Sequence, residues 1–267
     1  MLRKVATALV VALIASSGGL LTVSAAPRSD ASINNELETY IVAHPTDFVG
    51  IDRLVFEYTG KHIAVAAAGV IGQLTAAVAA EIVAAHDTSA TKAGAGDVMP
   101  MSGIPAYQIY VTTVPLSGGG AQIWGTWDFP DTWAGQGAPF DIAATSVSMN
   151  TCVQMSNLAI WTYKVGGGST NLGSQRAVFP ATGVEWNVQD YVSGFASMAD
   201  RGTTRVEVHR GSGCPPTVQV GAAFNYDANQ GNGSIVSIGF NFGFLSVSFS
   251  APVLDRPEGA GPIYFNI

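Results

Sequence analysis

The sequence predicts an α+β protein in which an N-terminal helical segment is followed by an antiparallel, β-sandwich-like domain. Three observations predict this. Residues 33–87 carry apolar side chains at intervals of three and four, the spacing of helices with one apolar face. From Ala106 onward the apolar period changes to two, with Gly, Pro, Asn and Ser clusters between the runs. A small, polar, unpatterned stretch lies between the two regions.

Residues 1–25 have the order of a secretory signal peptide. Arg3 and Lys4 give a positive start, Val5–Ala15 is apolar, and Val23-Ser24-Ala25 supplies the small residues of a cleavage site. A retained membrane anchor is the alternative, but the unbroken apolar run is shorter than the roughly 20 residues that a span needs. We therefore expect an exported protein that is secreted and extracellular or retained on the cell envelope.

Residues 26–87 are expected to form the helical N-terminal region. A first helix ends before Pro45, because proline cannot continue a helix. A second helix begins at a cap supplied by Thr46 or Asp47 and ends at Gly60. The region therefore starts with two short amphipathic helices.

The third segment of this region, Ile63–Ala85, is nearly all apolar. Its large residues repeat at helical spacing, which favours a buried helix packed against a sheet. Its length also permits a membrane-active or membrane-spanning helix, although Glu81 raises the cost of insertion. Membrane contact through residues 63–85 is thus an alternative to burial. The large residues are Val70, Ile71, Leu74, Val78 and Ile82.

Residues 88–104 have the composition of a flexible linker, so we place a domain boundary there and assign residues 105–267 to the antiparallel β domain. Such a stretch is also a natural site of proteolytic cleavage. A second interpretation is therefore that residues 28–97 form a pro-segment that is removed on maturation.

The β domain shows its strands through alternation. Apolar residues hold even positions from Val218 to Tyr226, and the same parity runs from Val236 to Phe244 before changing to odd positions from Leu245 to Phe249. Because side chains alternate between the faces of a strand, this change predicts a bulge or sharp bend near Gly243–Leu245.

The composition argues against nucleic-acid binding and is compatible with a large core. The chain has 12 Lys and Arg against 19 Asp and Glu, a net charge of −7, and only 12% charged residues. Backbone-tracking nucleic-acid binding requires clustered cations, so nucleic acid is not an expected partner. The apolar share of 48% is sufficient for a large core.

The two cysteines, Cys152 and Cys214, are predicted to form a disulfide, since an even count in an exported chain is typical of oxidising compartments. Closing a loop of about 60 residues stabilises a fold by roughly 4 kcal/mol in the chain-entropy model. Two buried free thiols are the alternative.

No catalytic or metal-binding motif is present. The sequence lacks G-x-S-x-G, H-E-x-x-H and a phosphate-binding loop, and none of the four histidines has a second histidine or a cysteine at metal-binding spacing. We therefore assign no catalytic residue, no metal ligand and no cofactor.

The most distinctive stretch surrounds three tryptophans that are interleaved with two carboxylates. Aromatic faces stack on sugar rings and carboxylates accept hydrogen bonds from hydroxyl groups, so the stretch is a candidate ligand-binding site. The structural alternative is that the tryptophans fill a core and that Asp128 fixes a turn. The candidate residues are Trp124, Trp127, Asp128, Asp131 and Trp133.

The favoured function is a secreted, non-enzymatic β-sandwich that binds a cell-surface molecule, a wall carbohydrate or a protein partner. One alternative is a membrane-active or pore-forming protein that uses the 63–85 segment or amphipathic β-hairpins. The other is an acid-type hydrolase, in which Asp128 or Asp131 meets Glu185 or Asp190 in one cleft.

Overall fold

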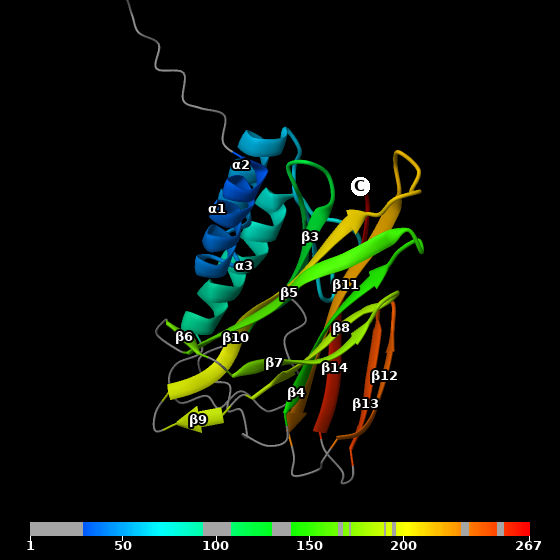
Figure 1. The fold of residues 1–267 in the computed structure, drawn as a ribbon. Coiled ribbons are helices and arrows are strands. Elements are labelled where there is room, and N and C mark those ends of the chain that lie inside the picture. The colour runs from blue at the N-terminus through cyan, green and yellow to red at the C-terminus, as the bar shows by residue number, and fades with distance from the viewer. Residues whose placement is uncertain are drawn as a thin grey trace, which may run out of the picture.

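The computed structural model describes residues 29–92, 108–129, 140–164, 168–170, 172–189, 191–193, 196–230, 235–249 and 254–267. In this part of the chain two antiparallel sheets face each other and three helices lie together on one side of them (Figure 1). The predicted α+β class with a sandwich-like β domain is confirmed. The predicted signal peptide, residues 1–25, lies outside the described residues.

The larger sheet, which we call sheet A, has the order β1-β2-β3-β10-β5-β6, with β9 paired to β10. Its neighbouring strands are all antiparallel. Its strands are β1 (Ala64–Ala67), β2 (Ile109–Pro115), β3 (Ala121–Asp128), β5 (Val153–Lys164), β6 (Ser169–Thr170), β9 (Tyr191–Ser193) and β10 (Ala196–Arg210).

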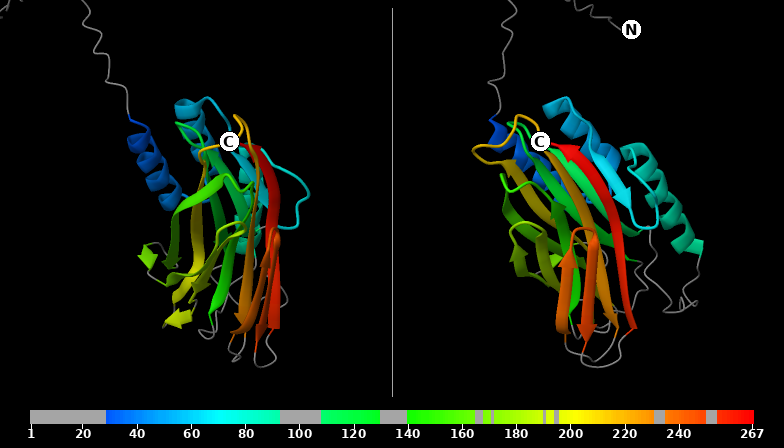
Figure 2. Two further views of the ribbon diagram at one scale, coloured as in Figure 1. Left: turned by 45° about the vertical axis from the view of Figure 1, so that its right-hand side comes forward. Right: turned by 90° about the vertical axis from the view of Figure 1, so that its right-hand side faces the viewer.

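The second sheet, sheet B, has the order β14-β11-β4-β8-β7, and a separate hairpin pairs β12 with β13. Figure 2 shows this hairpin beside β11 and β14, on the side of the sandwich away from the helices. These strands are β4 (Asp141–Ser148), β7 (Gly173–Phe179), β8 (Gly183–Val188), β11 (Gln219–Gln230), β12 (Ile235–Asn241), β13 (Phe244–Phe249) and β14 (Leu254–Asn266).

The core between the sheets follows the predicted alternation. Val206 and Val208 of β10 point inward from sheet A, and Val220, Phe224 and Tyr226 of β11 point inward from sheet B. All five side chains are fully buried. Burying one large apolar side chain contributes about 1.5–3 kcal/mol, so this layer is a main source of stability.

A second core lies between the helices and the outer face of sheet A. The helices are α1 (Asp30–Ala43), α2 (Phe48–Thr59) and α3 (Ala76–Lys92). Leu37 and Ile41 of α1 and Phe48 and Val55 of α2 are buried against strand residues that include Tyr110. The helices therefore cover one face of sheet A.

The predicted boundaries of α2 are confirmed. The Asp47 side chain caps the helix by accepting a hydrogen bond from the Gly50 amide at 2.9 Å. Gly60 ends the helix in the left-handed conformation with φ 68°, where glycine has no Cβ penalty.

The prediction of one helix over Ile63–Ala85 is wrong. The structure has strand β1 at Ala64–Ala67, a turn, and then α3 from Ala76. The side chains of β1 alternate between the two cores. Ala64 and Ala66 belong to the core between the sheets, and Val65 and Ala67 belong to the core between sheet A and the helices. A strand buried on both faces is apolar at every position, which hides its period.

Two consequences follow for the N-terminal region. Because β1 pairs with β2, residues 26–87 contribute a strand to sheet A as well as helices. Helix α3 extends to Lys92, beyond the expected start of the linker, and residues 93–107 lie outside the described part, so the domain boundary in 88–104 stays a prediction.

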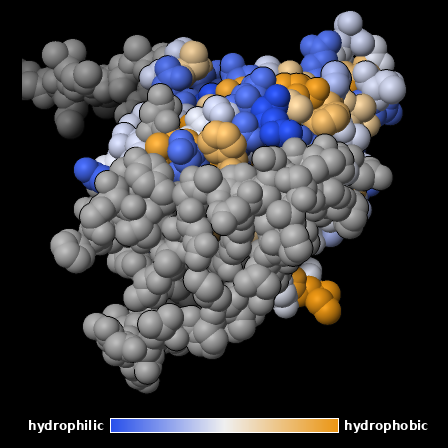
Figure 3. Space-filling model, turned by 90° about the horizontal axis from the view of Figure 1, so that it is seen from below, coloured by the Kyte–Doolittle hydropathy of each residue, from blue (hydrophilic) through white to orange (hydrophobic). Residues whose placement is uncertain are grey.

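Within the described residues no helix is long and apolar enough to cross a membrane. The view from below shows hydrophilic and hydrophobic residues intermixed on the described surface (Figure 3).

The change from even to odd apolar positions after Phe244 comes from a hairpin turn and not from the predicted bulge or bend within one strand. β12 ends at Asn241 and β13 begins at Phe244, with Gly243 at φ 70° in the turn. The register pairs Phe240 with Leu245, so even positions in one strand oppose odd positions in the other. A two-residue turn therefore accounts for the sequence pattern.

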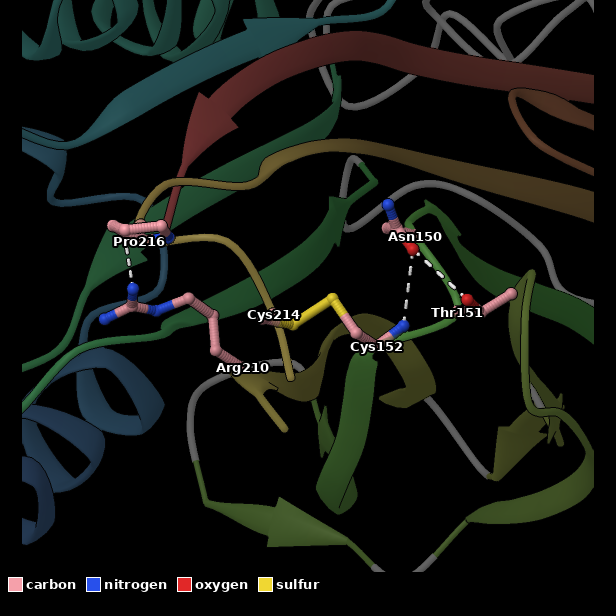
Figure 4. Close-up of a disulfide and its surroundings, with 6 residues drawn as sticks. All are labelled: Asn150, Thr151, Cys152, Arg210, Cys214 and Pro216. Atoms are coloured by element: carbon pink, nitrogen blue, oxygen red, sulfur yellow. Dashed lines mark hydrogen bonds between the residues drawn. A yellow bond between two sulfur atoms is a disulfide. The ribbon is translucent and has the colours of Figure 1, made fainter. Parts of the chain in front are cut away.

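The predicted disulfide between Cys152 and Cys214 is confirmed, with an S–S distance of 2.08 Å and a sequence separation of 62. It joins the start of β5 to the connection that follows β10 (Figure 4). Beside it, the Asn150 side-chain oxygen accepts hydrogen bonds from the Cys152 amide at 3.4 Å and the Thr151 hydroxyl at 3.2 Å.

Candidate functional site

Strand β3 sends its candidate residues to opposite faces of sheet A. Trp127 points into the sandwich core, where it is fully buried and its indole N–H donates to the Ala199 carbonyl at 3.0 Å. Its ring packs beside Phe224 and Tyr226, with centroids 6.2 and 5.2 Å away. Trp124 and Asp128 lie on the other face, toward the helices. Asp131 and Trp133 lie outside the described residues.

Trp124 is also buried, and it belongs to an aromatic and cationic stack. Its ring lies parallel to that of Trp161 on β5, with centroids 5.5 Å apart and planes at 22°. The Arg205 guanidinium lies 5.9 Å from the Trp124 ring and 5.4 Å from the Trp161 ring, within the range of cation–π attraction. Trp161 is only half-buried.

Arg205 connects this stack to helix α1. Its guanidinium forms an ion pair with Glu38 on α1, and its Nε donates to the Asn157 carbonyl at 3.0 Å. The Arg205 side chain is 11% exposed and that of Glu38 is 29% exposed. A buried cation requires such partners, so this pair holds α1 over β10.

Glu207, two residues further along β10, is the centre of a polar network. Its carboxylate accepts hydrogen bonds from Gln122 at 2.7 Å and from Asn157, and it contacts His209 at 3.3 Å. Burial by itself raises the pKa of Glu207. The hydrogen bonds from His209, Gln122 and Asn157 and the charge of Arg205 outweigh burial and lower this pKa to about 2.

A pocket of about 890 Å³ opens between α1, the α1–α2 turn and the ends of β3, β5 and β10. Trp161 and Tyr163 are half-buried in its wall. It lies next to the Arg205 stack, and its lining includes two of the candidate residues. The lining residues are Asn35, Glu38, Thr39, Val42, Ala43, His44, Pro45, Thr46, Asp47, Trp127, Asp128, Trp161, Tyr163, Lys164, Gly168, Ser169 and Arg201.

Asp128 is part of a charged pair at the pocket. Its Oδ1 lies 2.6 Å from Nε of Arg201, which is the cross-strand neighbour of Asp128 on β10. The Asp128 side chain is 29% exposed and that of Arg201 is 44% exposed. The pair therefore places hydrogen-bond acceptors and donors side by side at the surface of the pocket.

Two further contacts fix the helical side of the pocket. The Tyr163 hydroxyl donates to the Val42 carbonyl of α1 at 2.6 Å, and burial raises the pKa of Tyr163 so that it remains a donor. The Tyr40 hydroxyl donates to Asp47 at 2.5 Å, and this hydrogen bond holds the pKa of Asp47 below its usual value.

Sequence reasoning missed Trp161, Tyr163, Arg201 and Lys164. Trp161 and Tyr163 stand two apart at the end of a strand, so they share a face; that spacing was the available signal. Arg201 and Lys164 had no local signal, because pairing between distant strands brings them to the pocket.

The meeting of Asp128 with Glu185 in one cleft, which the alternative of an acid-type hydrolase requires, is not present. Glu185 alternates with Val184 and Trp186, which face the sandwich core, so it projects from the outer face of sheet B. Asp128 projects from the outer face of sheet A, on the opposite side of the sandwich. Burial raises the pKa of Glu185, although Arg176 lies 3.9 Å away. Asp190 and Asp131 lie outside the described residues.

Among the described residues no group of three or more His, Cys, Asp or Glu side chains is arranged to hold a metal ion.

The sequence matches no protein-family model and no curated protein. Its structure is similar to ACE19, the collagen-binding subdomain of the Enterococcus faecalis surface protein ACE, at 9% identity and a TM-score of 0.25, covering 52% of this chain and 84% of that chain. It is also similar to a structure concerning pH-induced modulation of Streptococcus parasanguinis adhesion by Fap1 fimbriae, at 8% identity, a TM-score of 0.29, and 62% and 84% coverage.

A structure described as a pore forming protein matches at 8% identity and a TM-score of 0.28, covering 57% of this chain and 84% of that chain. At these identities and TM-scores none of the three matches assigns a function to this chain.

Proposed function

We propose that the protein is an exported, non-enzymatic binding module, and that the pocket between α1 and sheet A takes a saccharide unit of a cell-surface or wall polymer. The observation that carries the proposal is the combination, in one open pocket of about 890 Å³, of two half-buried aromatic rings with the exposed Asp128–Arg201 pair. The volume is within the usual range of about 300–1,000 Å³ for small-molecule sites.

The chemistry of the lining suits a sugar. Trp161 and Tyr163 provide flat apolar surface for the C–H face of a pyranose ring, and Arg205 behind Trp161 fixes the ring plane. Asp128 accepts and Arg201 donates hydrogen bonds, which matches the dual character of sugar hydroxyl groups. In this proposal Trp124 and Trp127 support the site from behind.

Asp131 and Trp133 remain proposed ligand-binding residues, because they follow β3 within a few residues of Asp128. Export is supported by the predicted signal peptide and by the Cys152–Cys214 disulfide, which is typical of oxidising compartments.

Binding is favoured over catalysis by the state of the pocket carboxylates. Glu38 is paired with Arg205, Asp47 with Tyr40, and Asp128 with Arg201. General acid–base hydrolysis requires two carboxyl groups with separated pKa values in one cleft, whereas each of these three carboxylates already has a structural partner.

The test is a binding measurement on purified wall and surface polysaccharides with variants that block the pocket. Thr39→Trp places a large ring on the exposed, pocket-facing side of α1, and we expect it to weaken binding at least tenfold. Ser32→Trp, on the same helix but away from the pocket, is the matched control and should bind like the wild type.

Asp128→Asn tests the polar contact separately, and Glu57→Gln, at an exposed position of α2 outside the pocket, is its control. We expect about tenfold weaker binding for the Asp128 variant alone, as for loss of a charge-assisted hydrogen bond. Equal affinity of Thr39→Trp and wild type, with both folded, would exclude this pocket as the site.

A further inference from the structure

We infer that the ligand is an acidic saccharide, and that its carboxylate or phosphate group binds the Lys164 ammonium while its ring lies against Trp161 and Tyr163. This inference rests on the proposed function, because it names the ligand class of the same pocket.

The acidic side chains of the pocket already have partners. Three carboxylates line it: Glu38, Asp47 and Asp128. The first is paired with Arg205 and the third with Arg201, while Asp47 accepts hydrogen bonds from the Tyr40 hydroxyl and the Gly50 amide. Glu38 and Asp128 are therefore each paired with an arginine, whereas both partners of Asp47 are neutral groups.

Lys164 is the exception among the lining charges. Among the described residues no carboxylate lies within ion-pair distance of its ammonium. Its side chain is exposed, and it is the last residue of β5, directly after Tyr163. Of the two lining cations Lys164 and Arg201, only Lys164 thus lacks a carboxylate partner among the described residues.

The fold keeps this ammonium at the pocket. The Lys164 side chain lies over Gly168, a lining residue with φ +94°, such that a Cβ added to Gly168 would be 3.1 Å from Cε and 3.8 Å from Nζ of Lys164. The Lys164 amide also donates to the Gly168 carbonyl at 3.2 Å. Glycine is required there by its backbone conformation, and its missing side chain leaves room for the lysine stem.

The arrangement selects a single anionic group next to a sugar ring rather than a dense polyanion. One unpaired ammonium beside two aromatic rings satisfies one carboxylate or phosphate. A chain of closely spaced phosphates, as in nucleic acid, is repelled by the net negative charge. Carboxylated and phosphorylated saccharides share the required chemistry, and the experiment separates them.

The experiment is isothermal titration of the folded protein with matched ligands. The carboxylated ligands are digalacturonate and a hyaluronan disaccharide, each compared with its carboxyl-reduced neutral form; the phosphorylated ligand is a hexose monophosphate, compared with the free hexose. For every acidic ligand that binds, we expect an affinity about tenfold higher than that of its neutral form. We expect this preference to decrease with added salt, because salt screens the contact with the ammonium.

Lys164→Gln should remove the preference for the acidic form without weakening the neutral one, and Lys164→Arg should keep it. Lys61→Gln, an exposed lysine outside the pocket, is the matched control and should behave as wild type. This inference would be overturned if the wild type bound acidic and neutral forms equally and Lys164→Gln had the same affinities. If Thr39→Trp nevertheless lost binding, the proposed saccharide pocket would stand. Absence of binding to all ligands, acidic and neutral, would overturn both.

Discussion

Glu38 on α1 and Arg205 on β10 form an ion pair that attaches the first helix to the outer face of sheet A. Arg205 also lies against the rings of Trp124 and Trp161. Because α1 forms one wall of the pocket and Trp161 forms part of another, this single pair links the position of the helix to the shape of the site.

Glu38→Gln should therefore loosen α1 while the sandwich remains folded. The substitution leaves the Arg205 guanidinium, whose side chain is 11% exposed, without its carboxylate partner, and a lost hydrogen bond to a charged group costs about 1.5–3 kcal/mol. We expect faster amide hydrogen exchange in residues 33–43 and weaker ligand binding. Exchange in β10 and β11 should be unchanged.

Glu57→Gln on α2 is the control, and equal exchange of α1 in both variants would show that the pair does not hold the helix.

The stability of the protein should depend on pH through His209 and Glu207. The hydrogen bond to Glu207 raises the pKa of His209, so the stabilisation is fully present below about 6.5, the unfolded value, and is lost as pH rises through the folded pKa. The pKa of Glu207 is lowered from its ordinary value of 4.5 to about 2, so its contribution is present above pH 4.5 and is lost as pH falls toward 2. The pair is therefore most stabilising between pH 4.5 and about pH 6.5.

The measurement is the urea midpoint at several pH values for wild type and His209→Gln. The wild type should lose stability between pH 6 and pH 8 to a greater extent than the variant does, since only the wild type carries the titrating ring. Parallel profiles across this interval would show that His209 does not couple folding to protonation.

Local patterns predicted those parts of the fold in which one face of an element is buried and the other is not. The even positions of β11 and the limits of α2 followed from such patterns. Strand β1 did not, because Ile63–Ala68 is buried on both faces and carries no period. An apolar run of this kind has the same composition in a strand, a buried helix or a membrane segment.

The candidate site was only partly predictable for a different reason. Asp128 stood out because it follows Trp127 in the chain. Glu38, Arg201 and Lys164 belong to three separate elements, and only the packing of α1 on sheet A and the pairing of β10 with β3 and β5 bring them to one pocket. Contacts between residues so far apart in sequence leave no local pattern.

Gly202→Ala should test the structural role of Trp127. Gly202 is the cross-strand neighbour of Trp127, and a Cβ there would lie 2.0 Å from Cζ2 of the indole ring. Overpacking of this kind costs about 1–3 kcal/mol, so we expect a lower urea midpoint. Trp127→Phe removes the clashing part of the ring.

The double variant Gly202→Ala with Trp127→Phe should consequently lose less stability than the sum of the two single changes. Additive losses would indicate that the destabilisation by Gly202→Ala does not come from a clash with the Trp127 ring, and that close packing against Gly202 does not position Trp127.

Removing the disulfide should lower stability and preserve the fold. The native pairing of β5 with β10 is held independently by their hydrogen-bonded register, which reaches Val153 and Arg210 beside the bridge. The bridge closes a loop with a sequence separation of 62, so its loss should cost about 4 kcal/mol through the greater freedom of the unfolded chain. We expect Cys152→Ser with Cys214→Ser to keep the wild-type circular dichroism, to unfold at lower urea, and to show a larger denaturant slope because its unfolded state exposes more surface.

Reductant should shift the wild type to the behaviour of the double variant and leave the variant unchanged. A double variant that unfolds at the wild-type midpoint would mean that the unfolded chain is already constrained near Cys152 and Cys214 without the bridge.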